Sequence, residues 1–194
     1  RMLARLLRQF RSDERGASVL EAVIITPVLI WVYVGSFVFF DAFRTYSSSV
    51  KATYAVADVI SRQNQTVTAF DMAGFANIFE TMVRNNGDVR MRMTQIAYDE
   101  ATDSMSVEWS FATNGEARLF TANLADFVGL LPDMSDSERL VLVESFILYT
   151  TAFDIGINAL TFRNFTFTRP RTGRVPFDET INTAPSMPGI TNEG

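Results

Sequence analysis

Carboxylates and Ser-Lys pairs are the side chains that could carry catalysis here, because the 194 residues include neither Cys nor His. Their absence excludes Ser-His-Asp and Cys-His catalysis, thiolate sites and imidazole metal ligands. The acidic run of Asp99, Glu100 and Asp103 lacks the regular oxygen spacing of a calcium loop, so it is typical of a solvated turn. We therefore expect no enzyme, no cofactor and no metal site.

Three arginines near the end of the chain form the most concentrated group of positive charge in an otherwise acidic region. Arg169, Arg171 and Arg174 lie within six residues of one another. Such a patch could bind an anion or an acidic partner surface. The alternative is that the three side chains belong to a solvated strand end.

Glu21 stands directly before the longest apolar run. Ala22–Phe40 holds nineteen residues without a charge, which as a helix would cross the hydrocarbon core of about 30 Å. A buried core helix is the alternative, but soluble helices of this length normally have a polar face. A signal peptide has a shorter apolar region of about 7–15 residues. The run therefore predicts a transmembrane helix over 17–40, in which Pro27 removes one hydrogen bond and favours a kink.

Charge is distributed unevenly across this span. Residues 1–16 carry five arginines against two carboxylates, in an amphipathic pattern that suits the surface of a lipid membrane. Residues 41–194 carry twelve basic and nineteen acidic groups. Because Lys and Arg beside the first span stay cytoplasmic, we expect residues 1–16 in the cytoplasm and the larger part outside. Such an acidic domain is a poor candidate for binding nucleic acid.

Helical periodicity continues beyond the span, in a stripe that could pack against its own domain or against a neighbouring helix. The stripe comprises Phe43, Tyr46, Val50, Thr53, Ala57 and Ile60. A capping box at Thr68 and Asp71 begins a second helix, which the residues Asn85, Asn86 and Gly87 would end. We expect its core stripe to comprise Phe75, Ile78, Phe79 and Met82.

The apolar period then changes to two, which is typical of strands. Strands are predicted over 89–98, 104–112, 138–151 and 160–169, with a short helix within 119–131. The fold class is therefore α+β: a single N-terminal transmembrane helix that continues into a long helix, packed on an antiparallel sheet of about four strands. This outer domain covers 41–169, and the Pro-rich polar tail over 170–194 has neither helical nor strand periodicity.

The residues around the start of the span resemble those of type IV prepilins, and more narrowly the TadE/TadF-like minor pilins of the Tad (tight adherence) pilus system. The motif ERGASVLEAVIITPVL has the Gly16-to-Glu21 spacing that follows a basic leader in prepilins, and DVISRQ also resembles the family. The resemblance covers the first 62 residues well and the remainder only as a pattern. It implies a prepilin peptidase that cuts between Gly16 and Ala17. It also implies that Glu21 neutralises the freed amino terminus during assembly.

The resemblance implies a non-catalytic minor pilin or pseudopilin in the bacterial inner membrane, with a periplasmic domain and other pilins as partners. The alternative is an accessory structural subunit of another inner-membrane complex, such as an energy-transducing one. In that case the chain would keep its N-terminus uncleaved.

Overall fold

The computed structural model describes residues 14–84, 87–127, 129–151, 153 and 159–180, and only the backbone of residues 14–18 and 126. Its first element is helix α2 (Glu14–Ser61), which continues through Pro27. The chain divides into two units within this helix. Among the described residues, the first unit comprises α2 up to Phe43 with Thr151 and Phe153, and the second comprises the others.

In the first unit, α2 carries a nearly continuous apolar surface. Between Val19 and Phe40 only Val38 is buried, and the large side chains Trp31, Tyr33, Phe37, Phe39 and Phe40 are exposed. The ring of Phe37 meets that of Phe153 edge to face, with centroids 6.4 Å apart. Within the described residues this is the one helix long and apolar enough to cross a membrane.

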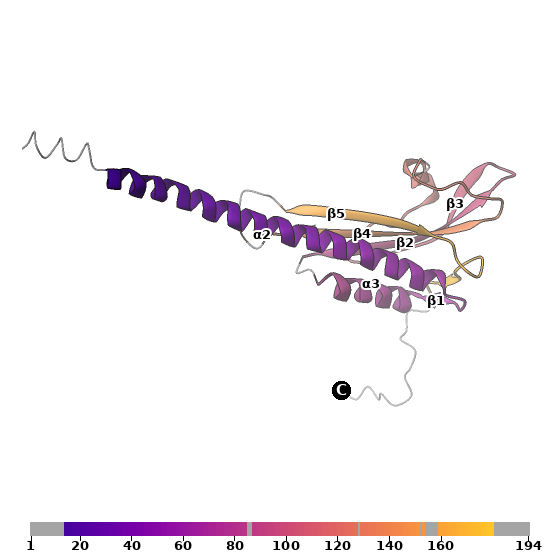
Figure 1. Cartoon of the computed structure of the whole chain (residues 1–194). Coiled ribbons are helices and arrows are strands. Elements are labelled where there is room, and N and C mark those ends of the chain that lie inside the picture. Colours follow the sequence, from indigo (N-terminus) through magenta and orange to yellow (C-terminus); the bar gives the residue numbers. More distant parts are fainter. Residues whose placement is uncertain (1–13, 85–86, 128, 152, 154–158, 181–194) are drawn as a thin grey trace, which may run out of the picture. The chain divides into compact units, whose positions relative to one another are not determined.

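The second unit is built on a four-stranded antiparallel sheet, which confirms the α+β expectation (Figure 1). Its strands are β2 (Val89–Asp99), β3 (Ser104–Ala112), β4 (Arg139–Tyr149) and β5 (Leu160–Thr168), in the spatial order β3-β2-β4-β5. Alternating side chains place one set on each face of the sheet. Because β4 is central and covered on both faces, nearly all of its residues are buried.

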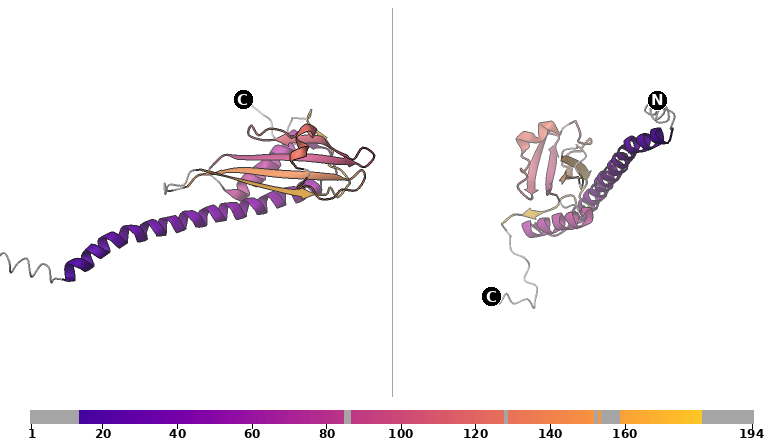
Figure 2. Two further views of the ribbon diagram at one scale, coloured as in Figure 1. Left: turned by 90° about the horizontal axis from the view of Figure 1, so that it is seen from above. Right: turned by 90° about the vertical axis from the view of Figure 1, so that its left-hand side faces the viewer.

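One face of the sheet packs against two helices, the Arg44–Ser61 part of α2 and α3 (Ala69–Val83) (Figure 2). Thr68 and Asp71 form the predicted capping box at the start of α3. Packing of the long helix against its own domain is confirmed for Thr53, Ala57 and Ile60, which are buried. The core on this face combines helix residues with Met91, Met93, Val141, Val143 and Ile147 from the strands.

The buried stripe of α3 differs from the expected one. Met72, Phe79 and Val83 are buried, and Phe75 and Ala76 pack against them. Ile78 and Met82 are exposed, so their assignment to the core was wrong. Steps of seven and four residues from Met72 to Phe79 and Val83 follow one helical face. Ile78 and Met82 fall on its flank, which the sheet does not cover.

The opposite face of the sheet is covered by the chain between β3 and β4. Leu119, Leu124 and Phe127 pack there against Ile96 and Leu142. The predicted short helix is a single 3₁₀ segment, η1 (Thr121–Asp126). Its few residues are held by the sheet beneath rather than by an extended helical hydrogen-bond ladder.

The chain after Pro170 contributes to the second unit, although the sequence predicts no regular element there. β6 (Phe177–Asp178) pairs in parallel with β1 (Val67–Thr68). Val175 is buried, its N–H donates to Gln95 Oε1 at 2.7 Å, and its carbonyl accepts from Trp109 Nε1 at 3.0 Å. The described part of the predicted tail is thus held by side chains of the sheet, and residues 181–194 lie outside the described residues.

Candidate functional site

The residues predicted for membrane storage and assembly lie in α2. Gly16 and Ala17 are in its first turn, and Glu21 follows one turn after Ala17. Residues four apart on a helix are neighbours on one face, so an amino group at residue 17 would lie close to the Glu21 side chain. Glu21 is exposed, and it is the only charged residue between Val19 and Phe40.

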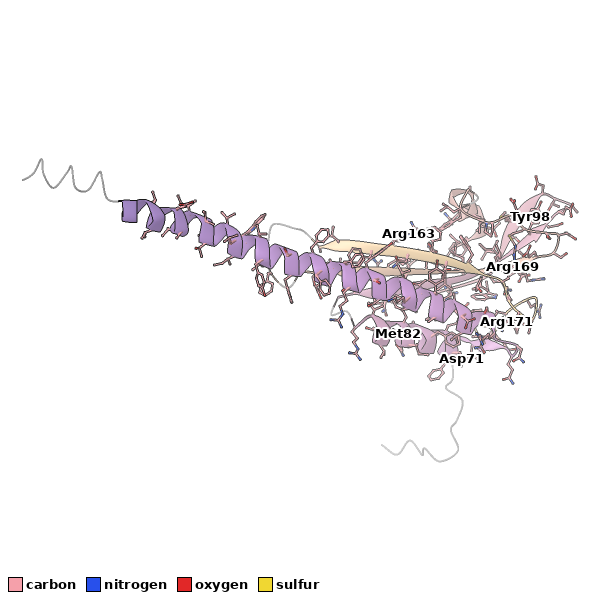
Figure 3. All side chains as sticks on the ribbon, in the orientation of Figure 1. Asp71, Met82, Tyr98, Arg163, Arg169 and Arg171 are labelled. Carbon is pink, nitrogen blue, oxygen red and sulfur yellow. The ribbon has the colours of Figure 1, made fainter. Side chains whose placement is uncertain are left out.

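Two of the three arginines in the predicted basic patch are neutralised by carboxylates from other elements. Arg169 pairs with Glu138, which directly precedes β4. Arg171 lies 3.6 Å from Asp58 of α2, and its backbone N–H donates to Ser61 at 2.9 Å (Figure 3). Arg174 is exposed and has no ion-pair partner among the described residues. The role of this patch as an anion or partner site therefore remains a prediction.

Asp58 also binds Arg62 at 2.7 Å, one helical turn away. The hydrogen bond from Arg62, with a smaller contribution from Arg171, holds the pKa of Asp58 below its ordinary value. Arg171 thus links the chain after β5 to the end of α2. Because these groups are exposed, the contribution of each pair to stability is small.

The acidic run at the β2–β3 turn forms the predicted solvated turn. Ala101 N–H donates to Asp99 Oδ1 at 2.9 Å, and the Tyr98 hydroxyl donates to Asp103 at 2.9 Å. That hydrogen bond raises the pKa of Tyr98. No group of His, Cys, Asp or Glu that could hold a metal ion occurs within the part of the chain that the structure describes.

A charged cluster on the β2-β4-β5 face was not predicted. Glu144 of β4 is fully buried and accepts from both sides: Arg92 Nε lies 2.6 Å from its Oε2, and Arg163 Nη2 lies 2.8 Å from its Oε1. The register of the strands brings both arginines to Glu144. Arg92 of β2 stands directly opposite Glu144, and Arg163 of β5 stands opposite Phe146, which is two residues from Glu144 on the same face of β4. The sequence signal was an acid within the apolar run LVLVESFIL. Its partners could not be found without the order of the strands.

Two aromatic rings flank the two guanidinium groups. The Arg163 carbon Cζ lies 5.7 Å from the ring centroid of Phe127 and 5.4 Å from that of Phe146, and Arg92 lies at 6.0 and 5.7 Å. Such distances allow cation–π attraction at the ring faces. The rings and the shared carboxylate therefore hold both guanidinium groups in fixed positions.

Beside this cluster lies an open pocket of about 540 Å³. Three arginines, three phenylalanines and two leucines form most of its walls. They are Arg92, Arg118, Arg163, Phe120, Phe127, Phe165, Leu119 and Leu130. Arg118 is bound to Glu179, and this hydrogen bond holds the pKa of Glu179 below its ordinary value. The pocket thus combines apolar walls with guanidinium groups, and its volume lies within the roughly 300–1,000 Å³ of ligand sites.

Comparisons with protein-family models, with curated proteins and with solved structures find no match to this chain.

Proposed function

We propose that this chain is a membrane-anchored, non-catalytic TadE-like minor pilin or pseudopilin that acts in pilus assembly through helix packing. The observation that carries the proposal is the exposed, largely apolar surface of α2 between Val19 and Phe40, in which Glu21 is the only charged residue. A contiguous exposed apolar surface of this extent marks a membrane or protein interaction site. In storage the surface faces lipid, and in the assembled fibre it faces the helices of neighbouring subunits.

Glu21 has a defined part in this proposal. A carboxylate near the start of a membrane helix costs free energy unless a positive group meets it. Cleavage after Gly16 would place a new amino terminus at Ala17, one turn from Glu21 on the same helical face. The pair can form within one subunit or between neighbours, and it neutralises a charge that would otherwise enter an apolar environment.

The N-terminal arginines and the acidic second unit support an orientation with residues 1–16 in the cytoplasm and the sheet outside. In this arrangement the bacterial inner membrane holds the apolar part of α2 between Val19 and Phe40, and the second unit projects into the periplasm. Membrane lipids, other pilins and a prepilin peptidase are the partners that the proposal requires.

Replacement of Glu21 tests the proposal. Glu21→Gln should leave the amount of protein in the membrane fraction unchanged, because it removes a charge from an apolar boundary. It should reduce recovery of the chain in the purified assembly. Glu100→Gln, at the exposed β2–β3 turn, is the matched control and should change neither quantity.

Equal recovery of wild type and Glu21→Gln in the assembly would contradict the role of Glu21. Mild-detergent purification of the wild type adds a second readout. If it recovers the chain only with an inner-membrane complex that contains no pilins, the accessory-subunit alternative replaces the pilin proposal.

A further inference from the structure

Among the side chains that the structure describes, the pocket beside Glu144 has an excess of one positive charge. Three guanidinium groups line it, from Arg92, Arg118 and Arg163, and two described carboxylates pair with them, Glu144 and Glu179. Both oxygens of Glu144 are already used, by Arg92 and Arg163. The local charge balance therefore leaves room for one further negative charge.

Arg163 is the group best placed to receive that charge. Its side chain is 51% exposed, whereas that of Arg92 is 10% exposed. Within the described residues, Glu144 Oε1 is the only hydrogen-bond acceptor of Arg163, so further N–H groups of its guanidinium remain available. Figure 3 shows Arg163 on β5, on the face of the sheet opposite to α3. Guanidinium groups bind carboxylates through paired N–H donors.

The remainder of the pocket is suited to an apolar group. Phe120 and Phe165 are 63% and 42% exposed although they are large aromatic residues, and Leu130 is 54% exposed beside them. A bound apolar group would cover these side chains and gain about 25 cal/mol for each Å² of apolar surface removed from water. The positive charge and the apolar wall lie in the same cavity.

We propose that this pocket binds a monocarboxylate attached to an apolar group, with the carboxylate on Arg163 and the apolar group against Phe120 and Phe165. A single carboxylate matches the single excess charge, whereas a phosphate dianion would bring more negative charge than the pocket balances. The ligand could be a free amphiphilic acid or an acidic side chain beside an apolar one in a protein. This inference does not depend on the proposed pilin function.

Isothermal titration of the full chain in lipid nanodiscs tests the inference, with empty nanodiscs as the blank. The probes are 3-phenylpropionate, its uncharged analogue 3-phenylpropanol, inorganic phosphate and the capped peptide acetyl-Phe-Glu-Phe-amide. We expect saturable binding of the two carboxylates that weakens with added salt. Tighter binding of the peptide would identify a protein side chain as the source, and tighter binding of phenylpropionate would identify a free acid.

Two variants with matched controls locate the site. Arg163→Gln should raise the dissociation constant of whichever carboxylate probe binds more tightly to the wild type, by about tenfold or more, because it removes the charged donor. Arg174→Gln has the same charge change at an exposed position away from the pocket and should have no effect. Phe120→Ala should weaken binding about threefold, and Phe70→Ala, exposed on α3, should not.

The inference is overturned if no carboxylate binds saturably, if phenylpropanol or phosphate binds as tightly as phenylpropionate, or if Arg163→Gln binds like the wild type. The urea midpoint of each variant, measured in the same nanodiscs, reports whether it is folded. If Arg163→Gln is unfolded, Phe120→Ala decides the outcome, because its exposed side chain is not required for the core.

Discussion

The Thr53 hydroxyl of α2 lies 2.9 Å from the Ser145 hydroxyl of β4, and both residues are buried. Thr53 Oγ1 donates its single proton to the Ser49 carbonyl at 2.8 Å, so Ser145 must be the donor between the two hydroxyls. A second hydrogen bond joins the sheet to the same helix, because Asn164 Nδ2 of β5 donates to Ser49 Oγ of α2 at 2.8 Å. These polar bridges fix the position of the Arg44–Ser61 part of α2 along the sheet.

Thr53→Val should destabilise the second unit by about 1–3 kcal/mol, because it leaves the buried Ser145 hydroxyl without its acceptor. The measurement is urea unfolding of the full chain in detergent, followed by tryptophan fluorescence in a Trp31→Phe background, in which Trp109 is the remaining tryptophan. Ser145→Ala in the same background should restore part of the loss, since it removes the unpaired donor. Strictly additive effects would show that the two hydroxyls are not coupled.

Glu144→Gln should be among the most destabilising polar substitutions in the chain. It removes the negative charge between Arg92 and Arg163, and breaking a buried charge pair costs about 3–5 kcal/mol. Asp58→Asn is the comparison, since Asp58 pairs with Arg62 while its side chain is 50% exposed and its loss should be much smaller. A similar loss for both variants in urea unfolding would contradict a structural role for the cluster.

Stability should fall in acid partly because of Glu138. The Ser135 backbone N–H, at 2.8 Å, and then Arg169 hold the pKa of Glu138 below its ordinary value of 4.5. The folded state therefore binds fewer protons than the unfolded state, so this stabilisation is present above about pH 4.5 and is lost as the pH falls through the folded pKa. Arg169→Gln should make the decline shallower, and Arg174→Gln should not. Identical pH profiles of both variants would exclude the contribution of Arg169.

Cleavage after Gly16 is part of the proposed function and can be tested directly. Gly16 is in the first turn of α2, and the proposal requires a small residue at the cut. Gly16→Leu should block removal of residues 1–16, which intact-mass measurement of the membrane-extracted protein can detect. Gly35→Leu is the control within the same helix, where an added Cβ meets no atom within 4 Å. A wild-type mass that retains residues 1–16 beside an active peptidase would contradict cleavage.

Orientation is tested with a reporter enzyme that is active only outside the cytoplasm. Fused after residue 62, directly behind α2, it should be active because the N-terminal arginines keep their end inside. Replacing Arg5, Arg8 and Arg11 by Glu should lower the active fraction. Activity of a cytoplasm-only reporter at the same fusion point would reverse the proposed orientation.

Local patterns predicted the strands well. The β3 bounds match the expected Ser104–Ala112, and the other three strands differ by one or two residues at their ends. Period-two alternation is a property of neighbouring residues, so it can be found without knowing the partner strand. The capping box at Thr68 was found for the same reason, since its two hydrogen bonds join residues three apart.

The parts that sequence reasoning missed depend on distant residues. Glu144 meets Arg92 and Arg163 only because β4 lies between β2 and β5, an order that no local pattern specifies. Likewise β6 is two residues long and has no periodicity to detect; it exists because Val67 offers a partner. The exposed positions of Ile78 and Met82 depend on which flank of α3 the sheet covers.

The parallel pair of Val67 with Phe177 has a consequence for how the second unit is synthesised. Its two strands come from opposite ends of the unit's sequence, and closing such a long loop costs chain entropy before any contact repays it. While the ribosome is still making β5, the core around α2 lacks Val175 and Phe177, and the Gln95 side chain lacks the Val175 N–H. Val175 and Phe177 are thus the last described residues to join a core whose other members are already made, so this core is completed by a long-range contact late in folding.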